Sequence, residues 1–102
     1  MSRLAESRKK SVPVGLTEEL LMALWSEILG HEEFGVEDNF FELGGNSLLA
    51  TQIVVRLCAI VGTEIPLGVF FEQPSIRGIH EALSSMLGVS ADTFLAKLAE
   101  EP

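Results

Sequence analysis

The stretch richest in usable chemistry surrounds Ser47, in the string Asp38-Asn39-Phe40-Phe41-Glu42-Leu43-Gly44-Gly45-Asn46-Ser47-Leu48. The two glycines leave the approach to Ser47 bare of side chains. We expect a helix to begin at Ser47, where unpaired N–H groups and the positive end of the helix dipole favour a phosphate. The hydroxyl is therefore well placed to receive a phosphodiester, although serine after glycine is also a common helix cap.

A serine hydrolase is one alternative for the same residue. A nucleophile elbow needs glycine two positions before and two positions after the serine. Gly45 meets the first requirement, but Leu49 occupies the second position. The only histidines, His31 and His80, have no motif partner that would make either a base. The pattern disfavours hydrolysis, and we expect no catalytic residue.

Metal and phosphate-loop sites also fail on spacing. A calcium loop starting at Asp38 would need glycine at position 43, where the sequence has Leu43. Two histidines and one cysteine do not make a metal-ligand set, and no loop ends in Gly-Lys-Ser/Thr. Cys58 lies in an apolar stretch, which is typical of a buried small hydrophobe. We therefore predict no metal site.

The elements that position Ser47 follow from apolar spacing and capping residues. The loop of residues 31–46 carries apolar anchors, so we expect it to be ordered. No stretch shows strand alternation, and the predicted fold class is all-α: a small four-helix bundle of three long helices and one short, with room for an extra C-terminal helix. We expect five helical segments. The first begins near Thr17 and ends at Gly30, the second runs from Ser47 to about Val61, and the third is short, from Leu67 to Phe71. The fourth runs from Ser75 to Gly88, and the last follows Ser90.

Length and charge limit the classes of function. A chain of 102 residues forms one domain, and no apolar run approaches a membrane span of about 18 residues. The opening residues do not resemble a signal peptide, so we expect a cytoplasmic protein. Residues 1–10 carry a net charge of +3 and the remainder −11. The strong negative charge of residues 11–102 disfavours binding to nucleic acids and anionic membranes and favours partners with basic surfaces.

The whole string from Asp38 to Leu48 closely resembles the attachment motif of peptidyl carrier (thiolation) domains of nonribosomal peptide synthetases. The resemblance covers roughly residues 16–88. It includes Thr17-Glu18-Glu19-Leu20 and Trp25-Ser26-Glu27-Ile28-Leu29, Leu48-Leu49-Ala50-Thr51-Gln52, and Pro66-Leu67 through Phe70-Phe71-Glu72-Gln73-Pro74-Ser75-Ile76. One departure is Asn46, because family members often have His or Asp directly before the serine.

The resemblance implies an acyl-carrier-like four-helix bundle that binds 4′-phosphopantetheine. A phosphopantetheinyl transferase would move this arm from coenzyme A to Ser47, with Gly45, Asn46 and Leu48 flanking the attachment point. The thiol of the arm would hold aminoacyl or peptidyl groups as thioesters. The implied partners are adenylation, condensation and thioesterase-type domains or enzymes, which the carrier visits as a monomer.

A docking surface is expected beside Ser47. Leu49, Ile53, Leu57 and Ile60 form the inward stripe of the second helix. Leu48, Thr51 and Val55 follow i, i+3, i+7 spacing on the outward side, which predicts partner contacts, although Val55 is also compatible with the core. Val69 and Phe70 are further contact candidates, with Phe71 assigned to the core.

Two alternatives remain open. An acyl carrier for polyketide or aryl-acid intermediates would use the same arm, and an unmodified helical adaptor would use only the acidic surface. The expected domain organisation is a flexible leader or linker at residues 1–16, the carrier domain at 17–88 and an extension at 89–102 whose role the sequence leaves open.

Overall fold

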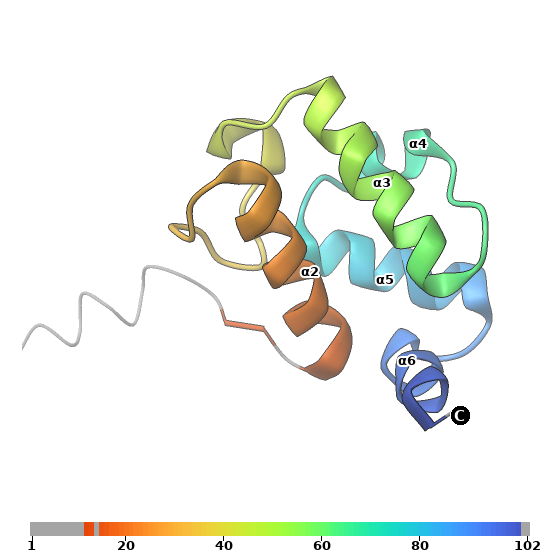
Figure 1. Cartoon of the computed structure of the whole chain (residues 1–102). Coiled ribbons are helices and arrows are strands. Elements are labelled where there is room, and N and C mark those ends of the chain that lie inside the picture. Colours follow the sequence, from red (N-terminus) through yellow and green to blue (C-terminus); the bar gives the residue numbers. More distant parts are fainter. Residues whose placement is uncertain (1–11, 14, 101–102) are drawn as a thin grey trace, which may run out of the picture.

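The computed structural model describes residues 12, 13 and 15–100, and most of the predicted leader lies outside this range. Every element in the described residues is helical. Three long helices and one short helix make the predicted four-helix bundle, which confirms the all-α fold, and a further helix follows them (Figure 1). The elements are α2 (Gly15–Leu29), the 3₁₀ helix η1 (Phe40–Leu43), α3 (Ser47–Val61), α4 (Leu67–Glu72), α5 (Ile76–Leu87) and α6 (Ala91–Glu100).

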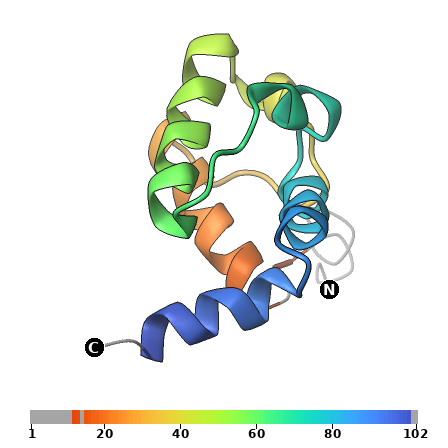
Figure 2. The same cartoon turned by 90° about the vertical axis from the view of Figure 1, so that its right-hand side faces the viewer.

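The two ends of the bundle carry different elements. The first turn of α3 and the short helix α4 lie at one end of the molecule, as both views show (Figures 1 and 2). Helix α6 lies at the opposite end, where it packs against α2 and α5. Ser47, the first residue of α3, is therefore remote from the C-terminal helix.

An aromatic cluster joins three elements in the core. Trp25 of α2, Phe40 of η1 and Phe70 of α4 are at most 1% exposed. The Trp25 ring meets the Phe40 ring edge-on at 5.4 Å between centroids and stacks on the Phe70 ring at 5.5 Å. Because large rings bury the most apolar area, this cluster is well suited to fix η1 and α4 against α2.

The loop of residues 31–46 is ordered, as its apolar anchors predicted. Phe34 and Val36 are buried. The Val36 carbonyl accepts a hydrogen bond from the Arg77 N–H at 2.8 Å, and the Phe40 N–H donates to the Pro74 carbonyl at 2.7 Å. These bonds join the loop to α5 and to the residues just before α5, and they fix the part of the chain that leads to Ser47.

Two details of the helices differ from expectation. Helix α2 begins at Gly15, and Thr17 does not cap it through its side chain: the Thr17 N–H instead donates to Asp92 Oδ1 of α6 at 2.7 Å. Ile60 is 37% exposed, whereas Val61 is buried. The i, i+4 spacing places Val61, and not Ile60, directly below Leu57 on the inward face. Along the described chain no helix combines the length and apolar character needed to cross a bilayer.

Candidate functional site

The start of α3 is capped by Asn46 and not by Ser47. Asn46 has extended backbone angles, and its Oδ1 accepts a hydrogen bond from the Leu49 N–H at 2.9 Å. Its backbone carbonyl accepts from the Ala50 N–H, also at 2.9 Å. Ser47 is solvent-exposed. The capping role that would have explained a serine here is therefore filled by its neighbour, and the Ser47 hydroxyl is left available.

The first turn of α3 suits an anion attached to Ser47. Within the described residues, the N–H groups of Ser47 and Leu48 have no hydrogen-bond acceptor. The turn carries no acidic side chain that would repel a phosphate. Unpaired N–H groups and the helix dipole both stabilise negative charge at this end. A phosphodiester on Ser47 Oγ thus fits the residues present.

Positions 44 and 45 require glycine for different structural reasons. Gly44 adopts the left-handed conformation, with φ of 106°, and its N–H bonds back to the Phe40 carbonyl. A Cβ at Gly45 would overlap the Phe40 ring. Gly45 thus allows the chain to cross this buried ring closely on its way to Ser47.

A single tautomer of His31 satisfies both of its hydrogen bonds. Its Nδ1 accepts from the Glu33 N–H at 3.1 Å, so Nε2 carries the hydrogen and donates to the Leu43 carbonyl at 2.9 Å. The other histidine, His80, bonds to Glu18. Both rings therefore hold structural hydrogen bonds, and neither is placed as a base for Ser47.

The predicted outward stripe of α3 is exposed. Leu48 and Val55 are 66% and 60% exposed, so Val55 does not belong to the core. Thr51 is also exposed, and its hydroxyl donates to the Ser47 carbonyl at 2.8 Å. Two side chains this apolar and this accessible, two turns apart on one helix stripe, are suited to contact a partner.

The assignment of the two phenylalanines of α4 was wrong. Phe70, expected at the surface, is 1% exposed and belongs to the aromatic core. Phe71, expected in the core, is 44% exposed and stacks on the Phe41 ring at 5.4 Å. Val69 is half-buried. Consecutive residues of a helix point about 100° apart, and the contact of Phe70 with Trp25 decides which ring turns inward.

Sequence reasoning missed a buried charged cluster between α2, α5 and α6. The Glu18 side chain is 3% exposed and pairs with Arg77 at 3.1 Å and with His80 Nδ1 at 2.8 Å. The hydrogen bond to Glu18 raises the pKa of Arg77. Burial would raise the pKa of Asp92, but its hydrogen bonding with Thr17 and the nearby His80 together outweigh burial and lower that pKa. The partners are 59 to 75 positions apart, which leaves no local sequence signal.

No group of metal-binding side chains occurs within residues 12–13 and 15–100. Cys58 is half-buried, less than expected, and its Sγ accepts a hydrogen bond from the Ile65 N–H at 3.3 Å. The geometry thus leaves Ser47, with its free first-turn amides and exposed neighbours, as the candidate site.

Comparison with known proteins shows the family to which the chain belongs. The family model described as "Phosphopantetheine attachment site" matches residues 19–83. The chain is 48% identical over 68 residues to CymA, a probable non-canonical nonribosomal peptide synthetase of Salinispora arenicola, a match that covers 67% of this chain and 1% of that protein. The chain thus spans a very small part of this relative.

Two solved structures extend the likeness to the fold. A peptidyl carrier protein, solved with coenzyme A and the phosphopantetheine transferase Sfp, is 31% identical, with a TM-score of 0.70 over 74% of this chain and 97% of that one. A docking-domain complex of the Pax nonribosomal peptide synthetase is 33% identical, with a TM-score of 0.72 over 93% of each chain. The chain therefore belongs to the phosphopantetheine-attachment family, as a peptidyl carrier domain whose cofactor is 4′-phosphopantetheine.

Proposed function

We propose that Ser47 is the attachment residue and that the domain carries aminoacyl or peptidyl groups on the arm during nonribosomal peptide synthesis. One observation at the start of α3 supports this proposal. Asn46 caps the helix through its Oδ1, and Ser47 next to it is exposed and is not needed as the cap. When bound, the arm supplies a thiol that holds the cargo as a thioester.

The chain's own residues prepare the attachment point. Gly45 lets the backbone cross Phe40 and present Ser47 outward. The N–H groups of Ser47 and Leu48 orient and stabilise the phosphate once it is attached. In this proposal the domain has no catalysis of its own, because both histidines hold hydrogen bonds elsewhere. Catalysis belongs to the partners, and tethering raises the effective concentration of cargo at each of their active sites.

The proposed partners are a phosphopantetheinyl transferase and adenylation, condensation and thioesterase-type domains. Leu48, Thr51 and Val55 form their first contact surface, because all three are exposed on the α3 stripe that begins beside Ser47. The half-buried Val69 of α4 is a further proposed contact, and the exposed Phe71 replaces Phe70 as the aromatic contact. A small apolar patch on an acidic body suits brief encounters with several enzymes, made by a cytoplasmic monomer.

The domain boundaries also belong to the proposal: a leader that ends before α2 begins at Gly15, a carrier that continues to residue 88 and an extension at 89–102. Helix α6 is buried against α2 and α5 through Ala91 and Leu95. The Asp92 hydrogen bond to the Thr17 N–H adds a polar connection. We therefore assign the extension a stabilising role in the carrier.

The experiment for this function separates peptidyl from polyketide or aryl cargo. The phosphopantetheinylated domain is incubated with ATP, a panel of adenylation enzymes and either amino acids or aryl acids, and in parallel with acyltransferases and acyl-coenzyme A donors. We expect an aminoacyl mass on the protein that hydroxylamine removes, because thioesters react with it. Loading only by acyltransferases would move the assignment to an acyl carrier, and loading of Ser47→Ala would remove the attachment claim.

A further inference from the structure

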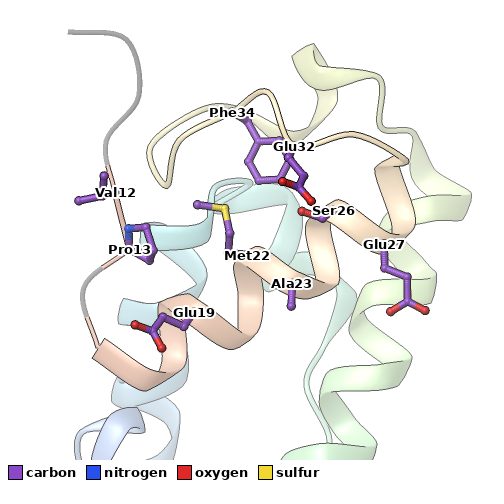
Figure 3. A pocket seen from close by; sticks show the side chains of 9 residues that line it. All are labelled: Val12, Pro13, Glu19, Met22, Ala23, Ser26, Glu27, Glu32 and Phe34. Carbon is purple, nitrogen blue, oxygen red and sulfur yellow. The ribbon is translucent and has the colours of Figure 1, made fainter. Parts of the chain in front are cut away.

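An open groove of about 750 Å³ runs along α2, and no residue of α3 lines it. Figure 3 shows the Met22 side chain between Val12 and Pro13 on one side and Phe34 on the other, with Ala23 next along the helix. These residues give the groove an apolar lining.

The groove is acidic at its edges. Its lining includes Glu19, Glu27 and Glu32 but no basic residue. Glu27 forms an exposed pair with Arg56 at 3.0 Å, whereas the carboxylates of Glu19 and Glu32 form no ion pair or hydrogen bond among the described residues. An occupant of this groove should therefore be basic, with aliphatic side-chain stems to cover Met22 and Phe34.

The chain enters this groove at a fixed point. The Val12 carbonyl accepts a hydrogen bond from Arg77 Nη2 at 3.4 Å. Arg77 is itself held by Glu18 and by Glu37, the latter at 2.9 Å. Val12 and Pro13 line the groove, so the first described residues of the chain lie at this site.

The residues directly before this point have the required chemistry. Arg8, Lys9 and Lys10 precede Val12 by two to four positions, and the net charge of residues 1–10 is +3. At roughly 3.4 Å per residue their backbone reaches about 7 to 14 Å from Val12. Their side chains combine a cation with an apolar stem, which matches the edges and the lining of the groove.

We propose that the basic segment, residues 1–11, docks in the α2 groove, with Arg8, Lys9 and Lys10 facing Glu19 and Glu32. The chain itself tethers this segment, so its effective concentration at the groove is in the millimolar range, and individually weak contacts suffice to populate the docked state. The segment preceding the carrier is thereby directed along α2, which leaves the Leu48 and Val55 surface open. This inference does not depend on modification of Ser47.

Paramagnetic relaxation enhancement on the full-length chain tests the docking. A nitroxide is placed at Ser7→Cys in a Cys58→Ser background, and broadening of the amide signals of Glu19, Ala23 and Glu32 is recorded. We expect strong broadening at low salt that falls to about half or less in 1 M NaCl, where the Debye length is about 3 Å. The Glu19→Gln/Glu32→Gln variant should lose broadening likewise. The matched control, Glu64→Gln/Glu72→Gln, changes two exposed carboxylates outside the groove lining and should retain it.

Other results overturn the proposal. Broadening confined to residues 12–15 would show that the segment leaves the groove empty. Broadening at Ala23 that survives both the groove variant and high salt would show contact without the charge pairing claimed here. If the groove variant and the control variant lost the same amount of broadening, the effect would depend on the net charge of the domain and not on the groove carboxylates.

Discussion

The Asp92 carboxylate accepts a hydrogen bond from the Thr17 N–H at 2.7 Å, across 75 positions of sequence. The last described helix therefore satisfies a donor in the first turn of α2, where capping side chains usually come from the residues just before the helix. A Cβ at Gly15 would overlap the Asp92 carboxylate, so this close approach also explains a glycine at the start of α2.

Asp92→Ala should reduce the free energy of unfolding by about 1 kcal/mol at pH 7, the usual cost of losing a capping carboxylate. Because the pKa of Asp92 is lowered in the folded state, its contribution is present above the unfolded pKa of about 3.9 and is lost as pH falls through the folded pKa. Urea unfolding at pH 7 and at pH 3 should show a difference from wild type that narrows in acid. A difference that widens in acid would contradict this assignment.

Arg77→Met should destabilise the fold far more than Arg56→Met. The first substitution leaves the Glu18 carboxylate, 3% exposed, without its bidentate partner. The second breaks a pair whose side chains are 42% and 61% exposed, and pairs of that kind contribute little. Chemical denaturation of both variants side by side is the measurement. Equal shifts in the urea midpoint would mean that the Glu18 carboxylate is stabilised without Arg77, which would contradict this prediction.

Gly45→Ala should cost about 1 to 3 kcal/mol of stability, because the added methyl group overlaps the buried Phe40 ring. The loop that presents Ser47 should shift with it, so the rate of phosphopantetheine transfer should also fall. Gly68→Ala is the matched control, since a Cβ there meets nothing within 4 Å and alanine favours the helix. Thermal unfolding that ranks the two variants the other way round would refute the packing argument.

Leu48→Glu and Val55→Glu should each slow loading by a phosphopantetheinyl transferase by roughly tenfold, the effect of losing about 1.4 kcal/mol at an interface. Both residues are more than half exposed, so helicity and stability should stay near wild type. The control is Ser85→Glu, which adds the same charge at an exposed position of α5. The measurement is kcat/KM for loading, and unchanged values in both α3 variants would remove the docking surface.

Local patterns predicted the fold and the position of Ser47 well. Apolar spacing and capping residues mark α3 and α5 within a residue or two, because these signals lie inside each helix. The attachment string predicted an exposed serine at a helix start, and the structure has one. The residue that caps α3 could not be predicted from the sequence, because it depends on which oxygen, that of Asn46 or that of Ser47, reaches the Leu49 N–H.

Errors arose where a distant contact decides the outcome. Phe70 and Phe71 are the same residue type, and only the position of Trp25 determines which one is buried. Thr17 is a good capping residue by type, yet Asp92 of α6 satisfies its N–H. Glu18 lies in the first turn of α2, and its pairing with Arg77 and His80 depends on how α5 packs against α2.

Attachment of the arm to Ser47 Oγ can be measured directly by mass. Wild type and Ser47→Ala are incubated with coenzyme A and a broad-specificity transferase, and intact mass is followed by fragmentation to locate the modified residue. We predict one phosphopantetheinyl group on wild type, located at Ser47, and none on a variant that unfolds like wild type. An unmodified wild-type chain beside a loaded control carrier, or a modified Ser47→Ala chain, would contradict the account.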